Sequence, residues 1–92
     1  MTRDHRNDPE PWLRAVGTAV QERRLALGYS QQELADMAGV HRTYVSDVER
    51  GARNVTVITV VKLADALEIE PFKLFRHAEE NQLKQSKSRA RR

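Results

Sequence analysis

Two short helices joined by a tight turn are predicted in the middle of the chain, and they restrict its fold more than any other feature. Ser30 and Glu33 form a capping box, in which each residue satisfies a backbone N–H at the start of a helix. Gly39 suits the left-handed backbone that ends a helix, and a second short helix follows from Arg42 to Arg50. A turn of three to four residues containing glycine makes the two helices cross steeply around one small apolar contact.

Three further helices are predicted from apolar residues at helical spacing. The first begins near Pro11 and ends at Gly28, another follows the N-cap residue Thr56, and the last begins at Pro71. The helix after Thr56 has one apolar stripe that should face the core, made of Val57, Val60, Val61, Ala64 and Leu67. That segment is also the one strand candidate, and it has nothing to pair with. The predicted fold class is therefore all-α, a compact five-helix bundle.

The charge pattern divides the chain into three parts: a flexible N-terminal arm (residues 1–10), a helical domain (residues 11–80) and a basic C-terminal tail (residues 81–92). The last nine residues contain five bases and no acid, so the first 83 residues, with 11 bases and 13 acids, carry a net charge of −2. Affinity for an anionic polymer must then come from local placement of charge. The tail is either a solubilising segment or an arm that touches nucleic-acid backbone.

Composition excludes several functions. The 92 residues include no cysteine, which rules out disulfides, thiolate metal sites and cysteine nucleophiles. No catalytic triad, phosphate-binding glycine loop or metal-ligand spacing of histidine is found, so we expect no enzyme activity, no metal and no cofactor. No apolar run approaches the ~20 residues of a membrane-spanning helix, so we expect a cytoplasmic protein without a membrane partner.

One side of the helix from Arg42 to Arg50 is suited to the major groove of DNA. At ~100° per residue, Val45, Val48 and Ala52 cluster on the side that faces the core. The opposite side and its flanks carry Arg42, Thr43, Tyr44, Ser46, Asp47 and Arg50. An arginine can bond O6 and N7 of guanine together, and Thr or Ser can reach a base or a phosphate. The pattern predicts a helix-turn-helix motif that binds double-stranded DNA.

Three stretches match the pattern of a known family: Gly28-Tyr29-Ser30-Gln31-Gln32-Glu33-Leu34-Ala35, Ala38-Gly39-Val40, and Val45-Ser46-Asp47-Val48-Glu49-Arg50-Gly51. Through them, residues 20–75 resemble the helix-turn-helix domain of the Cro and phage-repressor type, the Xre family. Within that family, His41-Arg42-Thr43-Tyr44-Val45-Ser46 and Glu49-Arg50-Gly51-Ala52-Arg53-Asn54 are similar to the controller proteins of restriction–modification systems.

The resemblance implies that four side chains of the motif contact bases or phosphates. Gln31, at the start of its first helix, would hold a phosphate. Arg42, Thr43 and Ser46 would face base edges or flanking phosphates. Phosphate contacts of this kind set the register of the protein on DNA, and base contacts set the sequence.

Four neighbouring residues are assigned less directly. The resemblance implies that Tyr44 lies at the groove edge near the dyad, although a half-buried packing role remains open. It also implies that Arg53 and Asn54, in the loop after the recognition helix, meet the sugar–phosphate backbone. His41 either caps that helix or touches a phosphate.

Two acidic residues have roles that are separate from phosphate binding. The resemblance implies an ion pair between Arg24 and Glu49 that locks the first helix to the recognition helix. Asp47 places an acid on the exposed face, where it either accepts from a cytosine amino group or holds Arg50 or Arg42 in place; we favour the second interpretation.

One recognition helix offers three or four base-reading side chains, too few for useful genomic specificity. We therefore expect a homodimer on a pseudo-palindromic operator, with recognition helices about 34 Å apart. The last predicted helix supplies the interface, among Ile69, Phe72, Phe75 and Ala78, unless these residues are all core of one protomer. Bound at a promoter, often that of its own gene, such a dimer blocks or recruits RNA polymerase.

Two other functions are open on the sequence. The chain could be the autoregulatory antitoxin of a toxin–antitoxin pair, in which an end of the chain binds the toxin. It could instead be a bridging factor that binds polymerase or a coactivator rather than bases.

Overall fold

Five helices make up the described part of the protein. The computed structural model describes the backbone of residues 10–90 and the side chains of residues 10–84. Its elements are α1 (Glu10–Leu27), α2 (Gln31–Ala38), α3 (Arg42–Glu49), α4 (Val57–Ala66) and α5 (Pro71–Ala90). The predicted all-α class is confirmed for this part of the chain. Residues 1–9 of the predicted arm, and the side chains of residues 85–92 of the predicted tail, lie outside the described residues.

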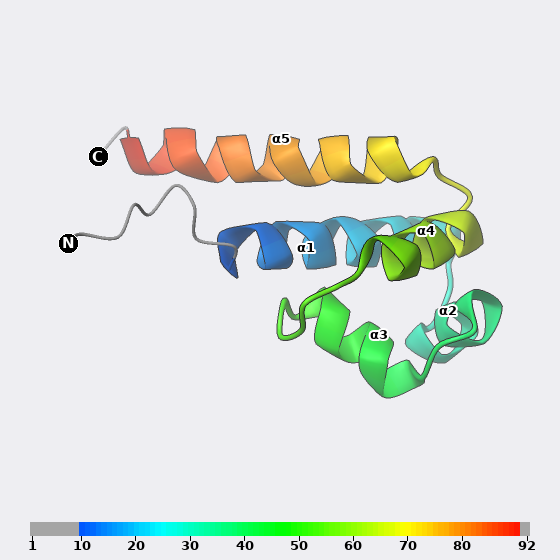
Figure 1. Ribbon diagram of the computed structural model, residues 1–92. Helices are drawn as coiled ribbons and strands as arrows, with labels where there is room; N and C mark the ends of the chain where they lie inside the picture. The colour runs from blue at the N-terminus through cyan, green and yellow to red at the C-terminus, as the bar shows by residue number, and fades with distance from the viewer. Residues whose placement is uncertain (1–9, 91–92) are drawn as a thin grey trace.

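The first helix is the support on which the others are arranged. α1 and α5 lie side by side and run in opposite directions, while α2 and α3 lie on the far side of α1 from α5 (Figure 1). α1 also contacts α3, and α2 contacts both α3 and α4. The α2–α3 pair is therefore held from two directions, by α1 and by α4.

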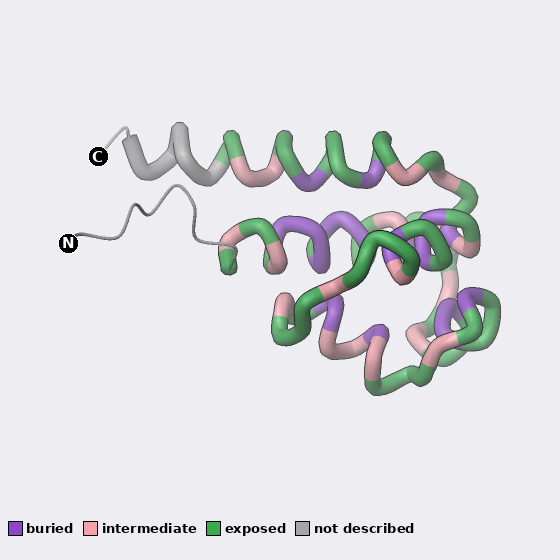
Figure 2. Tube along the Cα trace, in the orientation of Figure 1, coloured by how far each residue is buried: buried purple, intermediate pink, exposed green. Residues whose placement is uncertain are grey.

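The core is small and aliphatic. Its largest fully buried side chains are Val20, Leu34, Val45, Val48, Leu63, Leu67 and Leu74. Figure 2 shows buried positions along the sides of the helices that face one another. Each such side chain contributes about 1.5–3 kcal/mol when it leaves water, so the short helices α2 and α3 are stabilised mainly by packing rather than by their own length.

Two details of the predicted core are wrong. Val57 and Val61 of α4 are exposed, by 73% and 43%, because the inner face of that helix includes Leu63 and is centred to one side of the predicted stripe. Ala52 is exposed because α3 ends before it and Gly51, at φ 69°, turns the chain away from the helical path.

The fifth helix is longer than predicted and uses its faces differently. It continues to Ala90, past the position where the basic tail was expected to begin. Leu74 and Ala78 are buried, whereas Phe72 and Phe75 are 60% and 42% exposed. The assignment of Ala78 to a dimer interface is therefore wrong, because its methyl group is already fully enclosed within the protomer.

Candidate nucleic-acid interface

The turn between α2 and α3 fixes how the third helix is presented. Ser30 Oγ accepts from the backbone N–H of Glu33 at 3.0 Å, and Glu33 Oε1 accepts from the backbone N–H of Ser30 at 2.8 Å, which completes the capping box. Gly39 is left-handed (φ 72°), and its N–H donates to two carbonyl oxygens in the last turn of α2. Because residues 39–41 are the whole connection, the end of α2 determines where α3 begins.

The third helix is amphipathic, with Val45 and Val48 buried on its inner side. We call the opposite side the outer face of α3; it comprises His41, Arg42, Thr43 and Arg50, which are exposed, and Tyr44, Ser46 and Asp47, which are half-buried. Arg53 and Asn54 are exposed in the loop that follows. His41 occupies the N-cap position, but its side chain makes no capping hydrogen bond, so its imidazole has no role in holding the helix end.

An acidic side chain organises the arginines at the end of this face. Asp47 accepts from Arg50 through Oδ1 and from Arg53 Nη2 through Oδ2, the latter at 3.1 Å. The hydrogen bond from Arg53, and then that from Arg50, holds the pKa of the Asp47 carboxyl below its ordinary value. The Arg53 guanidinium also lies 5.0 Å from the centre of the Tyr44 ring, a cation–π contact. The sequence favoured a role for Asp47 in holding Arg50 or Arg42. In the structure its carboxylate holds Arg50 and Arg53.

A buried ion pair joins α1 to α3. Arg24 donates to both carboxylate oxygens of Glu49, through Nε at 2.7 Å and Nη2 at 3.0 Å, and its Nη1 donates to the carbonyl of Tyr29 at 2.8 Å. The hydrogen bond to Glu49 raises the pKa of Arg24 above its ordinary value. This is the pair that the family resemblance implied. The pair ties α3 to α1.

Gln31 belongs to the same network. Its Nε2 donates to Glu49 Oε1 at 3.0 Å, and the residue is half-buried. One amide hydrogen is therefore committed within the protein, and the second is not needed for this contact.

A glycine lets α3 lie against α1 with almost no gap. A Cβ atom added to Gly17 would lie 2.2 Å from the carbonyl oxygen of Val48 and 2.8 Å from that of Glu49. Both neighbours are backbone atoms, which cannot rotate away. Gly17 thus sets how closely α3 approaches α1. Sequence analysis missed this role, because several small residues occur in α1 and nothing in the local sequence distinguishes Gly17 from them.

Two surface hollows flank the start of α3. One, of about 470 Å³, is lined by Gln32, Asp36, Val40, His41, Arg42 and Thr43. The other, of about 450 Å³, is lined by Val40, His41, Thr43, Tyr44, Arg53 and Thr59. Gln32, Asp36 and Thr59 were not predicted as site residues. Thr59 lies in the first turn of α4, where its N–H donates to the Thr56 hydroxyl at 3.1 Å; that cap predicts the start of the helix, and nothing in the local sequence indicates that this turn reaches the start of α3.

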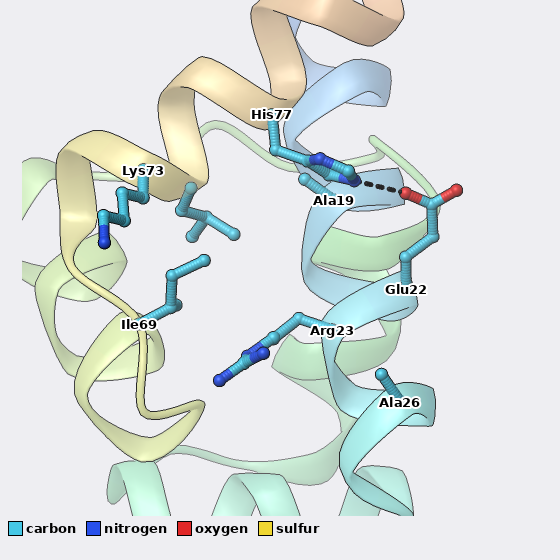
Figure 3. Close-up of a pocket in the computed structure, with 8 residues that line it drawn as sticks. Ala19, Glu22, Arg23, Ala26, Ile69, Lys73 and His77 are labelled. Atoms are coloured by element: carbon cyan, nitrogen blue, oxygen red, sulfur yellow. Dashed lines mark hydrogen bonds and ion pairs between the residues drawn. The ribbon is translucent and has the colours of Figure 1, made fainter.

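A third hollow, of about 510 Å³, lies between α1 and α5 (Figure 3). Figure 3 shows His77 of α5 directed at Glu22 of α1, with 2.7 Å between His77 Nε2 and Glu22 Oε1. Arg23 donates to the carbonyl oxygens of Leu67 and Glu68, at 2.9 and 3.0 Å, and so caps the end of α4. These contacts fasten α1 to the later helices.

Within the described part of the chain, no group of three or more His, Cys, Asp or Glu residues is placed to hold a metal ion. No helix described there has the length and apolar character needed to cross a membrane.

Comparison with known proteins identifies the family. The model of a helix-turn-helix family matches residues 20–74, which include α2, α3 and α4. The chain belongs to this Xre-type helix-turn-helix family. The control protein C.BamHI of Bacillus amyloliquefaciens is 43% identical to this helix-turn-helix protein over 56 residues, which are 60% of this chain and 69% of that protein. Two other curated relatives are matched over less than half of their own length, 45% and 48%.

Solved structures of restriction–modification controller proteins share the fold. That of C.AhdI from Aeromonas hydrophila is 48% identical, with a TM-score of 0.66 over 67% of this chain and 94% of that chain. The C.Esp1396I tetramer, solved in complex with its natural 35 base-pair operator, is 29% identical, with a TM-score of 0.73 over 78% of this chain and 95% of that chain. This helix-turn-helix protein is thus a DNA-binding regulator that resembles restriction–modification controllers.

Proposed function

We propose that the protein is a homodimeric transcriptional regulator that binds a pseudo-palindromic operator at its own promoter and acts as a restriction–modification controller. The observation that carries the proposal is the outer face of α3, where polar and cationic side chains are exposed while the inner side is fully buried. The similarity to control proteins supports the controller role over the antitoxin alternative.

The start of α3 supplies the base contacts. Arg42 and Thr43 are exposed at the helix end that would enter the groove first, and Ser46 follows one turn later. Arg42 would bond guanine O6 and N7 with both ends of its planar guanidinium, while the hydroxyls reach a neighbouring base or phosphate. These three side chains would define most of the half-site.

Residues around α3 would fix the position of the duplex. His41, Arg53 and Asn54 are exposed at the two ends of α3, where they would contact phosphates on either side of the groove. The free amide hydrogen of Gln31, at the first position of α2, would donate to another phosphate, because helix N-termini favour anions. Tyr44 would lie at the groove edge with Arg53 stacked on its ring.

A second copy of the chain would complete the site. Phe72 and Phe75 are exposed on α5, and Ile69 is half-buried beside them. Joining two protomers through these side chains would bury the aromatic rings and double the number of base contacts. Such a dimer at a promoter would either exclude RNA polymerase or contact it. Exclusion would repress transcription and contact would activate it.

The proposal is tested by the sequence preference of the Arg42→Ala variant. A preferred duplex is first selected from random DNA with the natural protein, and a scrambled duplex of equal length and composition serves as reference. Losing one bidentate guanine contact should lower the ratio of affinities for the two duplexes by about 5- to 150-fold. Lys62→Ala, which removes a cation from an exposed position on α4, should leave the ratio unchanged. Equal weakening of both duplexes by Arg42→Ala would contradict the assignment.

A further inference from the structure

Asp47 binds two arginines at once on the outer face of α3. Its two carboxylate oxygens are divided between Arg50, on the same helix, and Arg53, in the following loop. The Asp47 side chain is only 18% exposed, whereas those of the two arginines are 65% and 50% exposed. The three side chains therefore form a unit in which the carboxylate lies inside and the guanidinium groups lie outside.

The unit carries one net positive charge where the two arginines alone would carry two. A phosphate about 7 Å from the carboxylate in water is repelled by an amount that weakens binding about threefold. Each arginine donates to Asp47 through Nη2 and keeps its other N–H groups for DNA, so the carboxylate opposes phosphate binding through its charge. A duplex that offers only its backbone therefore gains less from this part of the surface than it would from two unpaired arginines.

A duplex with the right bases is affected less. A guanidinium that is already fixed in direction keeps its fit to two coplanar acceptors and loses less rotamer entropy on binding. The Tyr44 ring fixes Arg53 from a second side, at 5.0 Å. The carboxylate thus acts against contacts that depend on charge alone, and it preserves contacts that depend on direction.

We infer that Asp47 determines specificity by suppressing binding to DNA that lacks the operator, through its simultaneous hold on Arg50 and Arg53. The inference rests on the proposed function, because it concerns how that DNA site discriminates. It differs from a base contact: an Asp47 that accepted from a cytosine amino group would strengthen binding to one sequence and leave other DNA unaffected.

The test compares the natural protein with Asp47→Asn on the selected duplex and on its scrambled counterpart, over a series of salt concentrations. Asparagine has the same shape but no charge and holds the arginines weakly. We expect the variant to bind the scrambled duplex about threefold tighter, with a salt dependence steeper by about 0.9 in log–log slope, as for one more phosphate neutralised. The ratio of affinities for selected over scrambled DNA should fall, by up to about threefold, because the selected duplex gains less from removal of the carboxylate.

Asp65→Asn is the matched control. Asp65 is exposed in the last turn of α4, at the opposite end of that helix from the surface around α3. The substitution changes the net charge by the same amount without releasing the Arg50–Arg53 unit, so the affinity ratio should stay at the natural value.

A second variant separates the hold on the arginines from simple charge. In a protein that already carries Arg50→Gln, Asp47→Asn can release only Arg53. The increase in affinity for scrambled DNA that Asp47→Asn causes should therefore be smaller than in the natural protein. Neither Asp47 nor Arg50 belongs to the buried core, so circular dichroism should show an unchanged fold. Unchanged or weaker binding of scrambled DNA by Asp47→Asn would overturn the inference, as would an equal fall of the ratio in the Asp65 control.

The failure of this inference can be told apart from failure of the proposed function. If the natural protein selects no preferred duplex, the proposed function fails. If it selects one and Asp47→Asn keeps the full preference, the proposed function stands and only the role of Asp47 is wrong.

Discussion

At the scale of single residues, the ion pairs on either side of α3 differ in how far they are buried. The Arg24–Glu49 pair is buried and holds two helices together, with side chains 9% and 2% exposed. The pairs of Asp47 with Arg50 and Arg53 lie at the surface and organise the outer face of α3. Burial, more than distance, distinguishes the pair that joins two helices from the pairs at the surface.

Removing one partner of the buried pair should be costly. Arg24→Met leaves the Glu49 carboxylate buried beside an apolar chain, and Glu49→Gln leaves the guanidinium without its counter-charge. We expect either change to lower the free energy of unfolding by about 3–5 kcal/mol, measured by urea denaturation. The double variant should lose less than the sum of the two single losses. Losses below about 1 kcal/mol would show that the pair is solvated rather than buried.

The pH dependence of Asp47 follows from its pKa. Because Arg53 and Arg50 donate to the ionised carboxylate, its pKa lies below the ordinary value of 3.8. The stabilisation is therefore fully present above that value and is lost as the pH falls through the lowered pKa. A titration of the side-chain carboxyl carbon by NMR should give a midpoint below 3.8. A midpoint at or above 3.8 would mean that the arginines do not hold the carboxylate in solution.

At the scale of helices, the close approach of α1 and α3 gives the sharpest prediction. Gly17→Ala places a methyl group against two backbone carbonyls, at 2.2 and 2.8 Å, and the helices must separate to admit it. Thermal or urea unfolding should show a loss of about 1–3 kcal/mol. Thr18→Ala, at the next and exposed position of the same helix, should be neutral or slightly stabilising, because alanine has the higher helix propensity. Equal effects of the two changes would contradict the proposed packing.

The helix ends were predictable from sequence because their signals are local. Ser30 with Glu33, Gly39, and Thr56 each act on backbone groups within three or four residues, so their effect does not depend on the rest of the fold. The same is true of the side of α3 that carries Val45 and Val48.

Features that depend on contacts between distant segments were not predictable in this way. Arg23 caps α4 across 44 positions of sequence, and nothing near Arg23 indicates that partner. The exposure of Val57 and Val61 and the burial of Ala78 depend on how α4 and α5 are rotated about their axes. When a short helix has apolar residues on several of its faces, the spacing of those residues alone does not determine which face is buried.

At the scale of the whole molecule, the exposed aromatic side chains of α5 predict association. Phe72→Ser combined with Phe75→Ser removes no core side chain, so the protomer should stay folded. Sedimentation equilibrium should show a dimer for the natural protein and a shift of at least tenfold in dissociation constant for the variant, about 1.4 kcal/mol. Leu25→Ser, which alters a leucine 59% exposed on α1, is the control. A natural protein that stays monomeric at high concentration would rule out this interface.

In the proposed complex, two copies of α3 enter successive major grooves of one duplex. This arrangement can be tested by hydroxyl-radical footprinting of the DNA upstream of the gene, with the natural protein and with Arg42→Ala. We expect protected segments related by a two-fold axis, with centres about one helical turn or 34 Å apart, and their loss in the variant. A single unsymmetrical footprint, or one that Arg42→Ala leaves intact, would contradict it.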